Sequence, residues 1–309
     1  MRVVQGNYFK WAASFFQLMK PANLAYVYVG LAVLFWGSSA AVAKLLLAEL
    51  SNVQVFFYTS IIATITLFLL VVVQGKLAVL KQYRLRDYFT LAYTGFIGIF
   101  LYYILLFGAL TYLPAQIAFI INYLWPVLFV IFSIALLNER GTLRTFFGLL
   151  LSFVGVVVVL SKGSLGAFRL EAPAGILLAL GAAIAGGLFF ALDKKHNYER
   201  FTSTMLYFFF SSIYATITIL TVSTIPTINA QQLVGLGWFG VFVSGLAFTF
   251  WFLALKHGDT AKMSNIIFLT PFVSLLFIYF LLNEKILLTS FFGLALIIAG
   301  IIVQNRKKR

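Results

Sequence analysis

Polar and aromatic side chains that could hold a small molecule interrupt several long apolar stretches of the sequence. They are Trp36, Ser38, Ser39, Tyr102, Tyr103, Asn122, Tyr123, Trp125, Phe248, Trp251, Asn265 and Thr270. Hydroxyl, amide and indole groups form hydrogen bonds without carrying charge, and aromatic faces cover apolar groups. Each residue alone is as readily explained by packing, but the collection suits a small amphiphilic ligand. We therefore expect these residues to line a substrate-binding cavity.

The sequence lacks the residue sets that catalysis or metal binding requires. Cysteine is absent, and the two histidines, His196 and His257, fall in predicted loops beside Asp193 and Asp259. Neither a His-Glu-x-x-His motif nor a glycine-rich phosphate loop is present. We expect no catalytic residue, no metal and no cofactor. Acid–base or metal chemistry at the two histidines is the weaker alternative.

The composition places the chain in a membrane. Of its residues, 62% are hydrophobic and 10% are charged, and the mean hydropathy is +1.03. A soluble domain could not shield so much apolar surface from water. The net charge of +14 comes from short basic clusters between apolar stretches. The positive-inside rule explains such clusters, so we expect the lipid bilayer, and not nucleic acid, as the partner.

Ten apolar stretches are long enough to cross a hydrocarbon core of ~30 Å, which predicts an all-α polytopic membrane protein. They cover residues 23–46, 53–73, 89–110, 115–137, 143–161, 174–192, 203–223, 233–255, 261–282 and 287–304. With both termini in the cytoplasm, 18 of the 22 basic residues fall on the cytoplasmic side, which favours that orientation. Residues 1–22 are expected to form an interfacial segment, and residues 305–309 a basic cytoplasmic tail.

An internal duplication organises these spans. The segment Phe107–Val158 aligns without a gap on Phe252–Val303, at an offset of 145 residues. Five spans in each copy is an odd number, so the second copy must enter the membrane from the opposite side. We therefore predict two inverted five-helix repeats, residues 23–162 and 174–304, around a central cavity.

One proline lies near the middle of the fourth span and its repeat equivalent lies near the middle of the ninth. Pro126 and Pro271 each remove a backbone N–H and free the carbonyl four residues earlier, at Asn122 and Ile267. Lipid cannot satisfy those carbonyls, so they should face protein, water or a ligand. The paired prolines thus favour a cavity at the midplane over simple packing kinks.

Charged residues at the ends of the spans are candidates for a gate. Glu139 and Glu284 close the fourth and ninth spans on opposite sides of the membrane, and Lys44 lies in the outer part of the first span. Lys44 could meet an anionic group or extend to the interface. All eight acidic residues fall at predicted helix ends or in loops. The absence of a carboxylate at mid-membrane favours facilitated transport over ion coupling.

On these residues the chain resembles the drug/metabolite transporter superfamily, and within it the EamA-type transporters with ten helices. The run Asn122-Tyr123-Leu124-Trp125-Pro126 also resembles the signature of its aromatic amino-acid exporter branch, the YddG-like members. The resemblance implies a bacterial or archaeal inner-membrane protein that exports amino acids or related metabolites by alternating access. By position, Trp36 and Ser38 join that run as implied cavity residues.

Three points stay open at this stage. A proton-coupled exporter of drugs, nucleobases or other metabolites is the main alternative, although the first span has no glutamate of the kind that the small multidrug branch uses. A membrane protein that binds its ligand without moving it is a further alternative. The chain could act as a monomer or as a homodimer.

Overall fold

The computed structural model describes residues 21–138, 142–160, 172–258, 263, 266–267 and 269–305, and all the regular structure in this part of the chain is helical. Seven of the helices are long and apolar enough to cross a membrane. Three shorter apolar helices, Phe146–Val158, Thr270–Leu282 and Leu288–Val303, lie at the remaining predicted spans. The prediction of an all-α polytopic protein is confirmed. Residues 1–20 and 306–309, which carry the predicted interfacial segment and basic tail, lie outside the described part.

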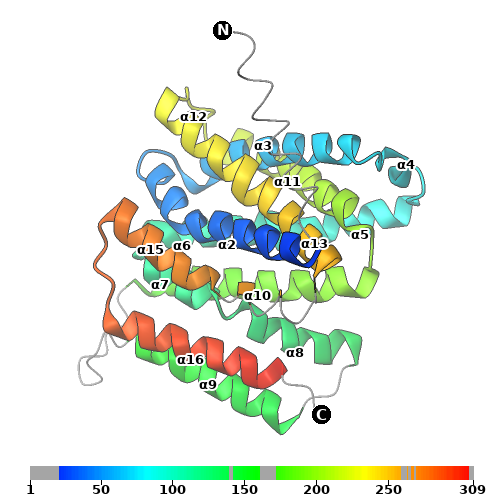
Figure 1. The fold of residues 1–309 in the computed structure, drawn as a ribbon. Helices are drawn as coiled ribbons and strands as arrows, with labels where there is room; N and C mark the ends of the chain where they lie inside the picture. Colours follow the sequence, from blue (N-terminus) through cyan, green and yellow to red (C-terminus); the bar gives the residue numbers. More distant parts are fainter. Residues whose placement is uncertain are drawn as a thin grey trace.

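The helices of the two repeats follow one another along the chain, as Figure 1 shows. The first repeat contains α2 (Pro21–Leu46), α3 (Asn52–Val73), α4 (Leu77–Leu80), α5 (Leu85–Gly95), η1 (Phe96–Leu101), α6 (Tyr102–Tyr112), α7 (Ala115–Asn122), α8 (Trp125–Leu137) and α9 (Leu143–Leu160). The second contains α10 (Pro173–His196), α11 (Arg200–Val222), α12 (Ala230–Gly237), η3 (Trp238–Leu246), α13 (Ala247–His257), α15 (Thr270–Leu282) and α16 (Leu288–Asn305).

Each of the main helix contacts has a counterpart in which the two repeats have exchanged roles. Helix α2 packs on α15 and α13, and its counterpart α10 packs on α8 and α6. Helix α3 packs on its own counterpart α11, and α9 on its counterpart α16. In Figure 1 the α9–α16 pair, in green and red, lies along one edge of the bundle. The halves are therefore related by an approximate twofold arrangement, as inverted repeats require.

Close glycine contacts repeat this twofold arrangement at the level of single residues. A Cβ at Gly37 would lie 2.6 Å from the Val273 side chain, and one at Gly187 would lie 2.7 Å from Leu128 Cβ. Val273 and Leu128 are equivalent at the 145-residue offset. Only a residue without a side chain permits such backbone approach, which is how helices pack closely in lipid. The small residues of the first and sixth spans therefore serve as helix contacts.

The ends of α8 and α15 explain the repeated Leu-Leu-Asn-Glu sequence. Each helix ends at an asparagine in the left-handed conformation, Asn138 with φ 56° and Asn283 with φ 52°. Asparagine tolerates this conformation better than other residues with side chains do, and it commonly terminates helices. The repeated motif thus stops both helices at equivalent points.

Two π-helical segments also occupy equivalent positions. Segment η1 interrupts the third span, and η3 interrupts the eighth at a place that includes the residues 145 positions later. A π segment widens the helix by one residue per turn and changes the direction of the side chains that follow. Tyr102 and Tyr103 follow η1 directly, and Phe248 follows η3 by two residues. The π segments therefore set how these three aromatic residues point.

The two histidines require a correction. His196 and His257 do not lie in loops as predicted, because each belongs to the last turn of a helix, α10 or α13. Lysines adjoin both of them, and cationic side chains at a helix C-terminus interact favourably with the helix dipole. The sixth and eighth spans consequently extend further than the hydropathy alone predicted.

Replacing Gly187 by alanine should destabilise the protein. Alanine has the higher helix propensity by ~1 kcal/mol. However, the added methyl group would meet Leu128 Cβ at 2.7 Å, and overpacking costs ~1–3 kcal/mol. We expect a lower midpoint of thermal unfolding in detergent. The control is Gly30→Ala in α2, where nothing lies within 4 Å of a Cβ, and its midpoint should be unchanged or higher. Equal behaviour of the two variants would contradict the packing argument.

Candidate functional site

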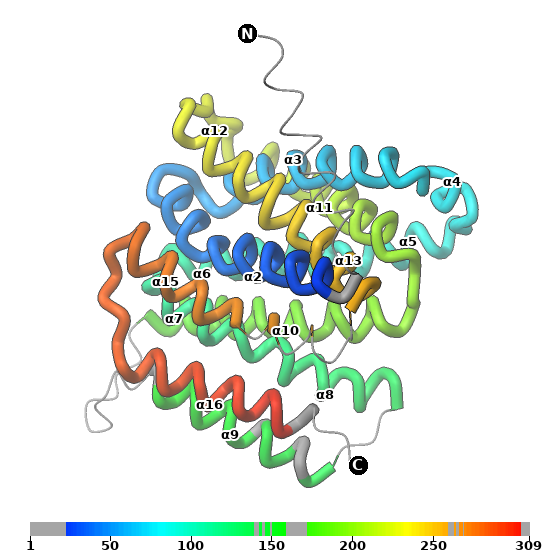
Figure 2. Tube along the Cα trace, in the orientation of Figure 1, coloured from blue at the N-terminus to red at the C-terminus, as the bar shows by residue number. Residues whose placement is uncertain are grey.

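The centre of the candidate site is the break in the fourth span. Helix α7 ends at Asn122 and α8 begins at Trp125, so the chain turns just before Pro126, the second residue of α8 (Figure 2). Asn122 is 2% exposed, and its Nδ2 donates a hydrogen bond to the Tyr102 hydroxyl at 3.0 Å. Its Oδ1 is buried without a hydrogen-bond partner. A buried amide oxygen of this kind is costly unless a ligand or water donates to it.

Helix α10 forms one wall beside Asn122. The Trp125 ring stacks on Phe190 with 4.5 Å between ring centroids. At Gly186 of the same helix, a Cβ would lie 3.3 Å from the Tyr102 ring and 3.4 Å from Trp125 Cβ. The small residue lets α10 approach both aromatic residues, so Tyr102, Asn122 and Trp125 converge on one place.

A second group of aromatic residues lies between α2 and α13. The Trp36 ring meets Phe248 edge to face at 5.2 Å and lies 6.4 Å from Trp251. All three side chains are partly exposed rather than buried. In the first repeat, Tyr103 contacts Tyr102 at 5.0 Å and Phe239 at 5.8 Å. The predicted aromatic residues therefore form two groups. Trp36, Phe248 and Trp251 lie between α2 and α13, and Tyr102 and Tyr103 lie on α6.

The two serines of the first span have partners within the protein. Ser38 donates to the Phe35 carbonyl and accepts a hydrogen bond from Trp238 Nε1 at 2.9 Å. Ser39 donates to the Trp36 carbonyl at 2.6 Å. Trp238 was not among the predicted residues. The sequence signal that could have found it is its indole N–H, which needs a hydrogen-bond acceptor when it is partly buried. Ser38 therefore fixes Trp238 at the start of η3.

The ninth span meets the fourth at the paired breaks. Thr270 begins α15, and its hydroxyl donates to the Ile267 carbonyl at 2.7 Å. This is the carbonyl that Pro271 frees, so the protein itself satisfies it. Asn265, the remaining predicted residue of this span, lies outside the described residues.

Two of the three predicted gate residues, Lys44 and Glu284, lie at the end of the bundle that the charge distribution assigns to the outside. Lys44 Nζ donates to the backbone carbonyls of Leu110 and Leu113, at the end of α6. Glu284 accepts from the backbone N–H groups of Ala115 at 3.0 Å and Gln116 at 3.5 Å, at the start of α7. Both charges compensate helix ends, and together they tie the first and ninth spans to the helices beside them. Glu139 lies outside the described residues.

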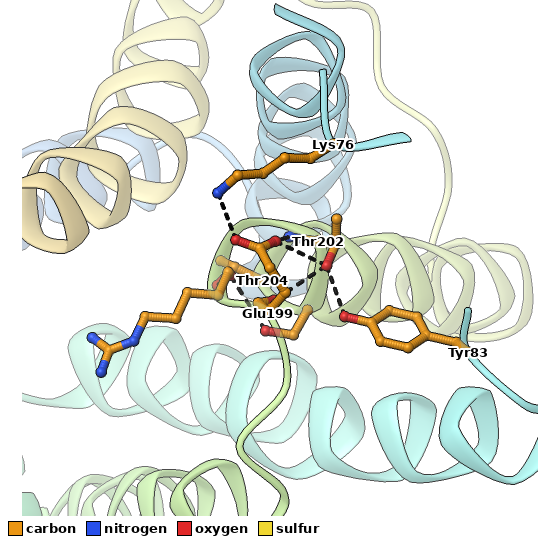
Figure 3. Close-up of polar contacts among 7 residues, drawn as sticks. Lys76, Tyr83, Glu199, Thr202 and Thr204 are labelled. Atoms are coloured by element: carbon orange, nitrogen blue, oxygen red, sulfur yellow. Dashed lines mark hydrogen bonds and ion pairs between the residues drawn. The ribbon is translucent and has the colours of Figure 1, made fainter. Parts of the chain in front are cut away.

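A polar cluster that the sequence did not indicate ties α3 to α11 at the opposite end. Figure 3 shows Lys76 paired with Glu199 at 2.6 Å, and the Tyr83 and Thr202 hydroxyls 2.7 Å apart. Lys76 also lies over the Phe201 ring at 3.9 Å. Burial works against the charged Glu199 carboxylate, but Lys76 and the Thr202 N–H outweigh it and hold the pKa of Glu199 below its ordinary value. Burial raises the pKa of Tyr83.

A carboxylate also lies against a buried tyrosine near this end. Asp193, in the last turn of α10, accepts a hydrogen bond from the Tyr207 hydroxyl at 2.9 Å. Tyr207 is 1% exposed, and Asp193 itself is partly buried. The sequence placed Asp193 just beyond its span, whereas α10 continues to His196. The pair is therefore a polar contact inside the helix bundle.

The described residues of the candidate site suit non-covalent recognition of a ligand. Its members are neutral hydrogen-bonding groups and aromatic faces, held by α2, α6, α7, α8, α13 and α15. Among the described residues, no group of three or more His, Cys, Asp or Glu side chains gathers in a way that could hold a metal ion. The arrangement suits a neutral or zwitterionic molecule with an apolar part.

Comparisons with known proteins find matches over most of the chain. The EamA-like transporter family matches residues 23–161 and again residues 173–306. YvbV of Bacillus subtilis, an uncharacterized transporter, is 28% identical over 282 residues, 90% of each chain. An uncharacterized transporter of Archaeoglobus fulgidus is 25% identical, covering 92% of this chain and 99% of its own.

Two further matches bear on the substrate and the fold. The aromatic amino acid exporter YddG of Ancylobacter novellus is 27% identical over 186 residues, 59% of this chain and 64% of its own. A solved crystal structure superposes with a TM-score of 0.67 at 22% identity, covering 92% of this chain and 97% of that one. This last likeness supports the fold alone.

Replacing Glu199 by glutamine should lower stability in a pH-dependent way. The folded-state pKa of Glu199 is depressed, so its contribution is present above the ordinary value and is lost as the pH falls through the folded value. The variant should unfold at a lower temperature than the parent at pH 7. The gap should narrow as the pH falls below the ordinary glutamate pKa of about 4.3. The control, Lys81→Gln at an exposed lysine of the same loop, should leave the profile unchanged. A gap that persists at low pH would contradict the ion-pair argument.

Proposed function

Because the chain belongs to the EamA-like transporter family, we propose that it exports small amphiphilic metabolites, neutral amino acids foremost, across the cytoplasmic membrane of a bacterium or archaeon. The proposed mechanism is alternating access driven by the gradient of the exported solute. Both termini face the cytoplasm in this proposal, as the distribution of basic residues favours.

The observation that carries the proposal is the Asn122 amide at the broken helix. Its Nδ2 is held by Tyr102, while its Oδ1 is buried and without a partner. A ligand ammonium or N–H group could donate to that oxygen, and the rings of Tyr102 and Trp125 could cover an apolar side chain. An amino acid with a neutral side chain has both features.

The comparisons support amino acids over other metabolites. One relative is named an aromatic amino acid exporter. This chain has aromatic rings at the candidate residues, with Trp36 and Phe248 in one group and Tyr102 and Trp125 in the other. Tryptophan, tyrosine and phenylalanine are therefore the first substrates to test.

The repeat contacts support alternating access. The two halves make equivalent contacts, so exchanging their conformations would open the site to the other side. Polar contacts join neighbouring helices at both ends of the bundle, at Glu284 and Lys44 on one side and at Lys76 and Glu199 on the other. Each group of contacts would have to break once in a transport cycle.

Asn122→Ala should weaken transport of amino acids. In proteoliposomes preloaded with unlabelled substrate, we expect counterflow uptake by the parent without any pH gradient. Loss of one hydrogen bond should raise the half-saturation concentration by about three- to tenfold. The control Gln231→Ala removes an exposed amide and should transport like the parent. No uptake of any aromatic, aliphatic or hydroxyl amino acid by the parent would contradict the substrate proposal.

Proton coupling is the second candidate, and the Asp193–Tyr207 contact favours it. The carboxylate is partly buried inside a membrane-spanning helix and bonded to a buried hydroxyl. Intramembrane carboxylates are typical proton carriers in transporters. In a coupled cycle, Asp193 would take up and release the exchanged proton.

Asp193→Asn separates the two mechanisms. If protons drive export, an imposed pH gradient should stimulate uptake by the parent and not by the variant, while counterflow without a gradient persists in both. Glu49→Gln, which alters an exposed carboxylate, is the control and should keep the stimulation. If the gradient has no effect on the parent, transport is facilitative and this candidate is wrong.

A further inference from the structure

An open groove lies on the surface of α5 beside the end of α10, outside the candidate transport site. Its volume is about 520 Å³. It is lined by Leu85, Arg86, Phe89, Thr90, Tyr93 and His196. Neither the proposed substrate nor the transport cycle uses these residues.

The lining changes character along the helix. Arg86, Thr90 and Tyr93 follow one another at helical spacing, so they share a face of α5. Phe89 is 69% exposed and Tyr93 is 55% exposed on that face. Arg86 and His196, both exposed, stand at the end of the groove that leads out of the helix bundle. The groove therefore has a cationic end, at the Arg86 guanidinium, and an aromatic end.

The depth of the groove in the membrane follows from the length of the span. Residues Leu85–Tyr112 form 28 residues of continuous helix. At 1.5 Å per residue this helix is about 42 Å long, longer than a hydrocarbon core of ~30 Å. Its first turns therefore reach the headgroup layer. Arg86 lies at that level, and Tyr93, two turns further, lies at the level of the acyl chains.

Asp87 lies beside the cationic end and interacts electrostatically with both Arg86 and His196. Asp87 accepts hydrogen bonds from the Arg84 backbone N–H at 2.7 Å and from the Tyr198 hydroxyl at 3.0 Å. It is not part of the groove lining. The Tyr198 ring stacks on His196 with 5.8 Å between centroids, which steadies the imidazole beside the groove. Asp87 therefore offsets part of the Arg86 charge, but its hydrogen bonds go to other groups, which leaves the guanidinium to donate to an anion in the groove.

We propose that this groove binds one anionic phospholipid. The Arg86 guanidinium and a His196 N–H donate to the lipid phosphate, because a guanidinium matches phosphate geometry with two parallel hydrogen bonds. One acyl chain lies over Phe89 and Tyr93. Basic pockets at the ends of transmembrane helices are suited to such headgroups, and the predicted orientation places this one in the cytoplasmic leaflet. The proposal does not depend on the identity of the substrate.

The test is the binding of phosphatidylglycerol to purified protein in detergent, measured by native mass spectrometry against phosphatidylcholine. We expect one phosphatidylglycerol to bind more tightly than phosphatidylcholine. Arg86→Gln should weaken it by about fivefold. Lys81→Gln, which removes the same charge from an exposed position on the same side, should bind like the parent. The thermal midpoint of each variant reports that it is folded.

A second variant and a competitor identify what the groove recognises. Phe89→Ala shortens the apolar wall and should also weaken phosphatidylglycerol. Inorganic phosphate at millimolar concentration should not displace the lipid, because it has no acyl chain to fill the aromatic end. Equal binding of the two lipids by the parent, unchanged binding by Arg86→Gln, or displacement by free phosphate would each overturn the proposal.

Discussion

Lipid offers no hydrogen-bond partner to a backbone carbonyl, and the candidate site depends on how the chain meets that constraint at its broken helices. A break is tolerated in a membrane only where protein surrounds it. Here the packing of α2 on α15, and of α10 on α8, encloses both breaks within the bundle. The glycines at positions 37 and 187 permit that approach. The same contacts that bury the breaks therefore bring the polar and aromatic groups of the site together.

Because the sequence is duplicated, the same kind of helix packing occurs twice in the molecule. The main helix contacts of the first repeat recur with the roles of the halves exchanged, so similar residue types stabilise both halves. Such an arrangement has two equivalent ways to pack, which is the structural requirement for alternating access. The charged contacts at the two ends differ in kind. Lys44 and Glu284 compensate helix ends, whereas Lys76 and Glu199 pair directly.

Local rules predicted the features that a single residue determines. Proline at positions 126 and 271 predicted the breaks, and the run of apolar residues predicted each span. Contacts between distant segments could not be read in this way. Nothing local marks Phe190 among 35 phenylalanines as the residue that stacks on Trp125, and nothing marks the carbonyls of α6 as the partners of Lys44. The π segments likewise follow from tertiary packing, for which the chain carries no local signal.

The asymmetry between the repeats argues that one half holds the ligand and the other supports the fold. Thr270 uses its hydroxyl to satisfy the Ile267 carbonyl, so the break in the second repeat is closed on itself. The equivalent residue of the first repeat, Trp125, has no hydroxyl and stacks on Phe190 instead. The position equivalent to Ile267 is Asn122, whose amide oxygen has no partner. Among the described residues, the break in the first repeat therefore keeps an unpartnered amide oxygen, whereas Thr270 at the second break is satisfied within the protein. Under the proposed function, a ligand that needs both an acceptor and an aromatic surface would bind against α7 and α8.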